Sequence, residues 1–131
     1  MPSSAVGVLL DTTVLIDLLH HREEAVSRVR DMALRGYAPA ICPITIAGLY
    51  AGIRKGEEQR TEELLSAFQW LPLTGDVARK AGEIVASKRR AGKTHALDDM
   101  LIAETAIHYG YSLLTDNRKD FMVTGLRLYS E

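Results

Sequence analysis

The sequence lacks the features that would cross-link the chain or place it in a membrane. It has one cysteine, Cys42, so no disulfide can form within the chain. The apolar neighbours of Cys42 predict a small buried side chain. No apolar run approaches the roughly 20 residues that a membrane-spanning helix needs. Met1–Ser4 lacks the basic segment of a signal peptide. We therefore expect a cytosolic protein with no membrane partner.

Charge of one sign is also lacking. The chain has 131 residues, with 16 Lys and Arg against 17 Asp and Glu, which gives a formal net charge of −1. Such a chain has no overall attraction to nucleic acid, so any contact with RNA or DNA must come from a local basic patch. The length is sufficient for one domain with a packed core, and we see no repeat or linker. We expect a single domain over residues 1–131.

Short apolar runs alternate with amphipathic segments along the chain. The expected strands cover residues 6–10, 37–42, 70–73, 112–115 and 126–129. The expected helices cover residues 14–19, 23–35, 44–54, 57–68, 76–90 and 97–109. Pro72 places the third strand at an edge of the sheet. Strands separated by helices predict an α/β fold with a central parallel β-sheet flanked by α-helices.

Acidic and amide side chains fall at the ends of these elements. Asp11 ends the first apolar run, Asp99 opens the helix at 97–109, and Asn117 and Asp120 follow the strand at 112–115. Functional groups of α/β folds gather at the carboxyl ends of parallel strands. Carboxylates gathered there predict a site for a hard divalent cation such as Mg²⁺. Such a site can cut phosphodiesters.

Four motifs carry a resemblance to a known family. They are Leu10–Ile16, Ile44–Gly52, Asp99–Ala106 and Thr115–Phe121, in this order along the chain. Together they resemble the PIN-domain nucleases, most closely the VapC-type toxins of toxin–antitoxin pairs. The resemblance implies a PIN-like domain with a Mg²⁺- or Mn²⁺-dependent endoribonuclease activity on structured RNA such as tRNA. It also implies a homodimer and a cognate VapB-type antitoxin that silences the toxin.

The resemblance also implies roles for individual residues. Asp11 and Asp99 match the central metal ligands of the family, and Asn117 and Asp120 match the acidic or amide positions that complete the site. Thr115 matches a hydroxyl residue near the metal. We therefore expect Asp11, Asp99, Asn117 and Asp120 to be both the catalytic residues and the metal-binding residues.

Gly48 departs from the family pattern, which has Glu at this position. The residue could have been changed deliberately or selected because an active toxin harms its host, the natural protein could be a degenerate member, or a neighbouring acid could take the role of the Glu. Glycine in a helix costs up to about 1 kcal/mol relative to alanine. The sequence gives Gly48 no structural purpose. This favours the interpretation that Gly48 has replaced a residue that forms helices more readily. We expect weakened metal binding and little or no cleavage.

Local basic residues are the candidates for contact with RNA phosphates. They are Lys88, Arg89, Arg90 and Lys93 before the third motif, and Arg118 and Lys119 within the fourth. Contacts of this kind weaken as salt concentration rises. The alternative for residues 88–90 is a solvated helix end, where cations also suit the helix dipole.

Several residues have simpler structural interpretations. Thr12 or Thr13 can cap the first helix, and Asp98 is expected to be the N-cap of the helix at 97–109. The acids of the helix at 57–68, including Glu57, are expected on an exposed face. The apolar residues of the 44–68 helical pair serve either a partner or the domain's own core. Trp70 is expected either in the core or on a dimer surface.

Two other functions compete with the nuclease. One is a PIN scaffold without catalysis that binds an antitoxin or RNA, and Gly48 supports it. The other is an aspartyl phosphotransferase, because Asp11 ends the first strand. That chemistry usually requires a second Asp two residues later, where this chain has Thr13.

Overall fold

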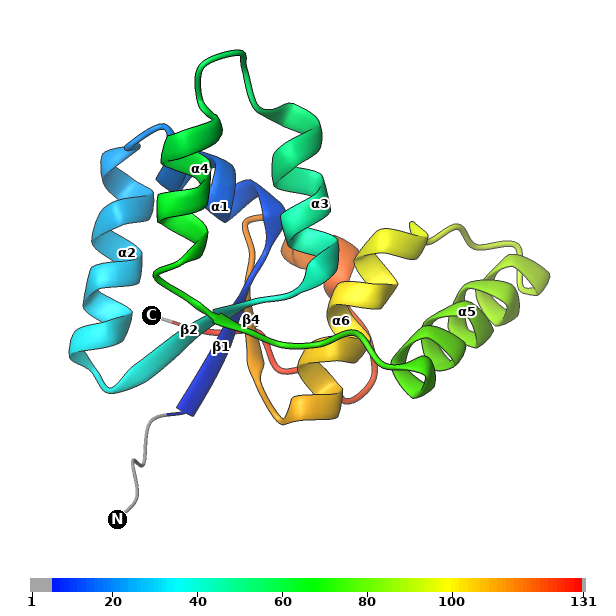
Figure 1. The fold of residues 1–131 in the computed structure, drawn as a ribbon. Coiled ribbons are helices and arrows are strands. Elements are labelled where there is room, and N and C mark those ends of the chain that lie inside the picture. Colours follow the sequence, from blue (N-terminus) through cyan, green and yellow to red (C-terminus); the bar gives the residue numbers. More distant parts are fainter. Residues whose placement is uncertain (1–5, 131) are drawn as a thin grey trace.

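Four parallel strands form the centre of the molecule (Figure 1). The computed structural model describes residues 6–130, so the prediction about Met1–Ser4 lies outside the described residues. The strands are β1 (Val6–Leu10), β2 (Tyr37–Ile41), β3 (Gln69–Trp70) and β4 (Ser112–Leu114), in the spatial order β3-β2-β1-β4. The two-residue β3 lies at an edge, as the nearby proline predicted. The parallel α/β fold that the sequence predicts is therefore confirmed.

Helices cover both faces of the sheet. They are α1 (Thr12–Leu19), α2 (Glu23–Leu34), α3 (Pro43–Gly52), α4 (Glu58–Leu65), α5 (Gly75–Arg90) and α6 (Leu97–Tyr109), with a 3₁₀ turn, η1, at Arg118–Phe121. The end of α6 is fixed by Gly110, whose φ of 72° lies in the left-handed region that glycine adopts without strain. No helix within residues 6–130 combines the length and the apolar character needed to cross a membrane.

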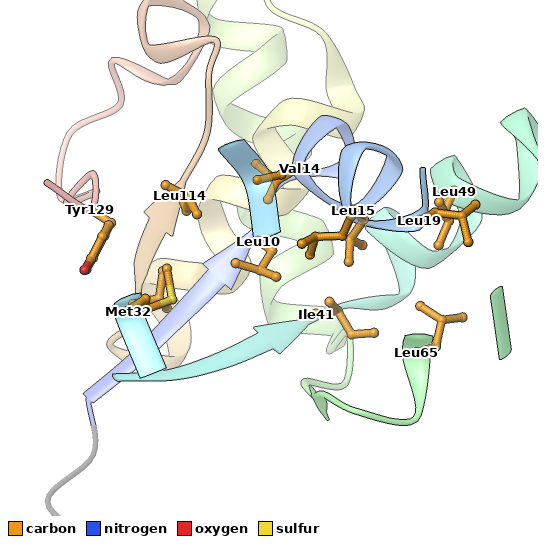
Figure 2. Close-up of a cluster of buried hydrophobic side chains, with 13 residues drawn as sticks. Leu10, Val14, Leu15, Leu19, Met32, Ile41, Leu49, Leu65, Leu114 and Tyr129 are labelled. Carbon is orange, nitrogen blue, oxygen red and sulfur yellow. The ribbon is translucent and has the colours of Figure 1, made fainter. Parts of the chain in front are cut away.

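Alternate residues of β1 serve two separate apolar layers. Val8 and Leu10 pack with side chains of α1 to α4, whereas Leu9 packs with side chains of α6 on the other face. Figure 2 shows Leu10, Leu15 and Ile41 within the first layer. Helix α5 does not cover the sheet but packs against α6, and both lie on the side of the sheet away from α1 and α2 (Figure 1). The burial of β1 on both faces explains its continuous apolar sequence.

Helix caps differ from the sequence predictions at two sites. Asp11, and not Thr12 or Thr13, is the N-cap of α1, and its carboxylate accepts a 2.8 Å hydrogen bond from the N–H of Thr12. Asp98 is not the N-cap of α6, because the helix begins directly after Ala96. Asp11 therefore follows β1 and caps α1 at once, whereas Asp98 lies within the first turn of α6.

The end of the chain also differs from its prediction. Residues 126–129 do not form a strand, because only Leu128 bridges to Leu113 of β4. Two backbone hydrogen bonds hold this segment: Leu113 donates to the carbonyl of Arg127 at 2.9 Å and accepts from Tyr129 at 2.8 Å.

The acids of the 57–68 helix are exposed as predicted except for Glu57, and the apolar helical pair is partly buried. Glu57 is only 8% exposed, so its predicted exposed position is wrong. Leu49 and Leu65 are buried in the core, and the other apolar residues of the pair lie half-buried against it. Trp70 is 53% exposed, which excludes the core from the two locations predicted for it.

Candidate active site

Asp11 and Thr115 join the ends of β1 and β4. Asp11 donates its backbone N–H to the carbonyl of Leu114 at 3.0 Å, and Thr115 Oγ1 donates to Asp11 Oδ2 at 2.7 Å. Thr115 Oγ1 also accepts a 3.0 Å hydrogen bond from the N–H of Asn117. Asp11 and Thr115 are both buried, so this network fixes the orientation of the carboxylate and the start of the following loop.

The carboxylate of Asp11 is energetically unfavourable when ionised. Burial raises the pKa of Asp11 above its usual value, while the hydrogen bonds from Thr115 and Thr12 oppose the rise. The charges of Asp98 and Asp116 raise the pKa further. A cation beside Asp11 would reverse these electrostatic effects.

The ionised form of Asp99 is also unfavourable, and its pKa is raised further than that of Asp11. It lies in the first turn of α6 and is half-buried. Burial raises the pKa of Asp99 to about 6, and repulsion from Asp98, Asp11 and Asp120 contributes to the rise. The helix dipole favours an ionised acid at this position, but burial and like charge outweigh it. Asp11 and Asp99 are therefore close enough to influence each other, although they are distant in sequence.

A cavity of about 410 Å³ opens over these acids. It lies between the first turns of α1, α3 and α6 and the loop after β4. Its walls contain three of the four predicted site residues, Asp11, Asp99 and Asn117, together with Asp98. The remaining wall residues are Thr12, Thr13, Ile44, Ala47, Gly48 and Ile102. The structure therefore brings together groups from the first, third and fourth motifs, and Gly48 of the second motif faces the same space.

Asp120, the fourth predicted residue, lines a neighbouring cavity. This space of about 350 Å³ has a polar lining that includes Asp99, Lys119 and Asp120. It also includes Thr94 and His95, which the sequence analysis did not identify because no motif surrounds them. Asp99 lines both cavities, so the two spaces share one carboxylate.

The predicted basic residues occupy different surroundings. Lys119 is the one that lines the polar cavity with Asp99 and Asp120. Arg118 instead donates to the carbonyl of Tyr129 at 3.3 Å and lines an apolar hollow near the chain end. Arg90 and Lys93 are exposed, and neither lines either acidic cavity. Lys119 is thus the basic side chain best placed beside the acids.

Gly48 has a packing role that the sequence did not reveal. A Cβ atom on Gly48 would lie 2.7 Å from Cγ2 and 3.1 Å from Oγ1 of Thr12. Carbon atoms in normal contact are about 3.5–4.0 Å apart. The absence of a side chain therefore permits the close approach of α3 to α1, and the expectation that Gly48 serves no structural purpose is wrong.

Comparisons with known proteins decide the family. The family model described as PIN domain matches residues 8–124 of this chain. The chain belongs to the PIN-domain family. It is 32% identical to Ribonuclease VapC19 of Mycobacterium tuberculosis over 115 residues, which cover 86% of this chain and 90% of the relative. It is 34% identical to Ribonuclease VapC10 of the same species over 111 residues, which cover 84% of this chain and 82% of the relative.

Solved structures agree with this PIN fold. A chain of a toxin-antitoxin complex from Klebsiella pneumoniae is 32% identical, with a TM-score of 0.72 over 91% of this chain and 94% of that chain. A chain of VapBC2 from Rickettsia felis, bound to a DNA fragment from its promoter, gives a TM-score of 0.79 over 95% of this chain and 98% of that chain. Its identity is 24%, so this second likeness supports the fold alone.

The donor atoms in the PIN domain suit a small divalent cation. The groups that face the larger acidic cavity are carboxylates and an amide, and oxygen ligands are those that Mg²⁺ prefers. Within residues 6–130, no three Asp, Glu, His or Cys side chains already surround one metal position. Mg²⁺ commonly uses one or two carboxylates and completes its shell with water and substrate phosphate, so Asp11 and Asp99 fit this requirement.

Proposed function

We propose that this PIN domain is a Mg²⁺- or Mn²⁺-dependent endoribonuclease and the toxin of a VapBC-type pair. The observation that carries this proposal is the convergence of Asp11, Asp99 and Asn117 on one cavity from three separate motifs. The relatives named as ribonucleases support the reaction class. The proposed substrate is structured RNA such as tRNA, in the cytoplasm.

The residues of the cavity divide the work of phosphodiester hydrolysis. Asp11 and Asp99 hold the cation, and Asn117 offers an amide oxygen to it or to its water. A bound cation supplies a water of lowered pKa and stabilises charge on the leaving oxygen. Thr115 acts through Asp11 by keeping its carboxylate in one orientation. Lys119 and Asp120 line the adjoining cavity. Lys119 contacts the RNA backbone, and Asp120 contacts the outer waters of the metal site.

The glycine at position 48 reduces but does not abolish this activity. Asp98 lines the same cavity and its charge acts on both Asp11 and Asp99. This supports the interpretation in which a neighbouring acid takes over from the missing Glu. We expect Asp98 to attract the hydrated cation without binding it directly. Loss of one acidic group still weakens metal binding, so we expect slow cleavage.

The partner we propose is a VapB-type antitoxin bound to a homodimer of this chain. The support comes from the solved toxin-antitoxin complexes that share this fold. Exposed apolar residues on this chain, such as Trp70 and Leu97, are available for such contacts, at 53% and 51% exposure.

A second candidate function is an RNA- or antitoxin-binding scaffold without catalysis. The observation that favours it is the close contact between the Gly48 backbone and Thr12, which leaves no room for a Glu side chain without adjustment. A cleavage assay separates the two candidates.

The test uses a total tRNA pool with Mg²⁺, Mn²⁺ or EDTA, and compares this chain with Asp99→Asn. A matched control is Asp31→Asn, which removes the same charge from an exposed position on α2. We expect slow metal-dependent cleavage by the chain and by the control, and none by Asp99→Asn. RNA binding without cleavage by any of the three proteins would favour the scaffold.

A further inference from the structure

A second cavity of about 410 Å³ lies between α5, α6 and residues 122–124. Most of its surface is apolar, and the apolar side chains are Ile84, Met100, Ile107, Met122 and Val123. It belongs to the side of the sheet where α5 packs against α6 (Figure 1). None of the four predicted site residues lines it, so the proposed reaction leaves this space without a role.

Glu104 of α6 lines this cavity, and the charge of Lys80 acts on its carboxylate. The residue is 6% exposed. Among residues 6–130, no hydrogen bond or ion pair to its carboxylate is present. Burial raises the pKa of Glu104, and the charge of Lys80 partly offsets the rise. The carboxylate oxygens are not fully enclosed, so a ligand in the cavity that supplies N–H donors can reach them.

Basic side chains surround the same space and connect it with the acidic site. Lys80 and Lys88 of α5 are part of its lining, and Lys80 is exposed. His95 lines this cavity and also the polar cavity that contains Asp99 and Asp120. A molecule in the apolar space would therefore lie beside the polar cavity, which shares Asp99 with the proposed cleavage site, and would have cationic side chains along its edge.

We propose that this cavity binds a guanine base of the RNA substrate, beside the polar cavity that shares Asp99 with the proposed cleavage site. The inference rests on the proposed ribonuclease function. Proteins that read RNA sequence bind unpaired bases between side chains and form hydrogen bonds with their Watson–Crick edges. Met100, Ile107 and Met122 offer apolar contact for the flat faces of the base. Lys80 and Lys88 offer positive charge to its phosphate.

The carboxylate of Glu104 selects guanine over the other bases. Guanine presents two neighbouring donors, N1–H and the N2 amino group, which match the two oxygens of a carboxylate. Adenine and cytosine each place a ring-nitrogen acceptor beside their amino group, and that acceptor would repel the second oxygen. Uracil offers one N–H between two carbonyls. A cationic side chain of another protein would also satisfy Glu104, but Lys80 and Lys88 disfavour its approach.

Methionine methyl groups provide a direct test. The native chain labelled with ¹³C at its methionine methyls is titrated in EDTA with GMP, AMP, CMP and UMP, and separately with n-butylammonium. Met100 and Met122 line the cavity. Met32 of α2 is buried in the core on the other face of the sheet and is an internal control. The variant is Glu104→Gln, and the matched control is Glu24→Gln, an exposed residue of α2.

We expect GMP to shift the Met100 and Met122 signals, with Met32 unchanged and the other nucleotides at least tenfold weaker. In Glu104→Gln, GMP should bind on the order of tenfold more weakly, whereas Glu24→Gln should match the native chain. Selectivity on the native chain tests the proposal even if Glu104→Gln does not fold.

Three results would overturn the guanine site. They are no shift with any nucleotide, equal shifts with all four, or shifts with n-butylammonium and none with GMP. The titration requires no metal and no cleavage, so it separates the two proposals. Selective GMP binding by a chain that cuts no RNA would remove only the catalytic proposal. RNA cleavage by a chain without GMP selectivity would remove only the base site.

Discussion

Thr115 Oγ1 donates a 2.7 Å hydrogen bond to Asp11 Oδ2, although the two residues are 104 positions apart in the chain. The same oxygen accepts the N–H of Asn117. One buried hydroxyl therefore connects the acid after β1 with the loop after β4. This side chain and the N–H of Thr12 together orient the Asp11 carboxylate of the proposed metal site.

Replacement of the Thr115 hydroxyl should change both the stability of the protein and the pKa of Asp11. Thr115→Val keeps the shape of the side chain but leaves the Asn117 N–H without its acceptor and Asp11 Oδ2 without its donor, while Asp11 Oδ1 still accepts from the N–H of Thr12. We expect a loss of roughly 1–3 kcal/mol in the free energy of unfolding, measured by urea denaturation. The pKa of Asp11 should rise further, because a hydrogen bond that lowers it is lost. Thr115→Ser keeps the hydroxyl and should remain near the native values; equal stability of Thr115→Val would contradict the role of the hydroxyl.

The raised pKa of Asp99 predicts a specific dependence of stability on pH. Its pKa is raised from 3.8 to about 6, so between these pH values the folded protein holds a proton that the unfolded chain has lost. The contribution of Asp99 to stability is therefore complete below pH 3.8 and is lost as pH rises to about 6.

Asp99→Asn should remove this penalty in the metal-free protein. At pH 7.5 the free energy of unfolding of the variant should be about 1–2 kcal/mol higher than that of the native chain. This difference is smaller than the full pKa shift implies, because Asp99 is partly exposed to solvent. At pH 3.5 the two proteins should be equal, because Asp99 is then neutral. Urea denaturation in EDTA at both pH values measures the difference, and a less stable variant at pH 7.5 would refute the assignment.

The contact between Gly48 and Thr12 predicts an unusual response to alanine. Alanine is a better helix former than glycine by up to about 1 kcal/mol, yet the new Cβ would press against Thr12. We expect Gly48→Ala to lower the free energy of unfolding by about 1 kcal/mol or more, since overpacking typically costs 1–3 kcal/mol.

Two further variants isolate this contact. Gly82 lies within α5 and would place a Cβ in open space, so Gly82→Ala should stabilise the protein by roughly 1 kcal/mol. Thr12→Ala removes the two closest atoms and leaves Thr12 Cβ, at 3.5 Å, in ordinary contact with the new atom, so it should restore stability when combined with Gly48→Ala. Additive effects in this double-mutant cycle would show that the two residues do not interact.

Glu57 should contribute to stability through its contacts. Its carboxylate accepts the Arg54 N–H at 2.7 Å and Arg60 Nη2 at 3.0 Å, and His20 Nε2 lies 3.2 Å away. The hydrogen bond from Arg54 lowers the pKa of Glu57, so its contribution is present above pH 4.5 and is lost as pH falls below that value. We expect Glu57→Gln to lower the melting temperature at pH 7 by more than the exposed control Glu83→Gln. Equal melting temperatures for the two variants would show that the Glu57 contacts add no stability.

The regular part of the fold was predictable from the sequence because its signals are local. The apolar run before Asp11 matches β1, and the apolar helix after Asp99 matches α6, with Gly110 at its end. The grouping of Asp11 and Asn117 was also predictable, because the carboxyl ends of parallel strands lie at one edge of a sheet. Asp99 follows no strand but lies in the first turn of α6, and its place beside Asp11 was expected only from the family resemblance. Their metal-binding and catalytic roles stay predictions.

Features that depend on contacts between distant elements were not predictable. The sequence predicts an exposed position for Glu57, but in the structure the turn before α4 directs its carboxylate toward Arg54 and His20. The sequence alone gives no packing role for Gly48, because Thr12 is 36 positions away. Only the packing of α3 on α1 brings the two residues together. Glu104 lies within the third motif, but the motif carries no sign of the cavity, which forms only where α5 packs against α6.

The central claim is that Asp11 and Asp99 form one divalent-cation site. The most direct test is a Mg²⁺ titration of the native chain with NMR observation of its ¹³C-labelled carboxyl groups, with exposed Asp31 as the internal control. We predict that the Asp11 and Asp99 signals move together with one dissociation constant, and that bound Mg²⁺ lowers the pKa of Asp99 from about 6. Unchanged Asp11 and Asp99 signals at millimolar Mg²⁺, or two unrelated dissociation constants, would contradict the claim.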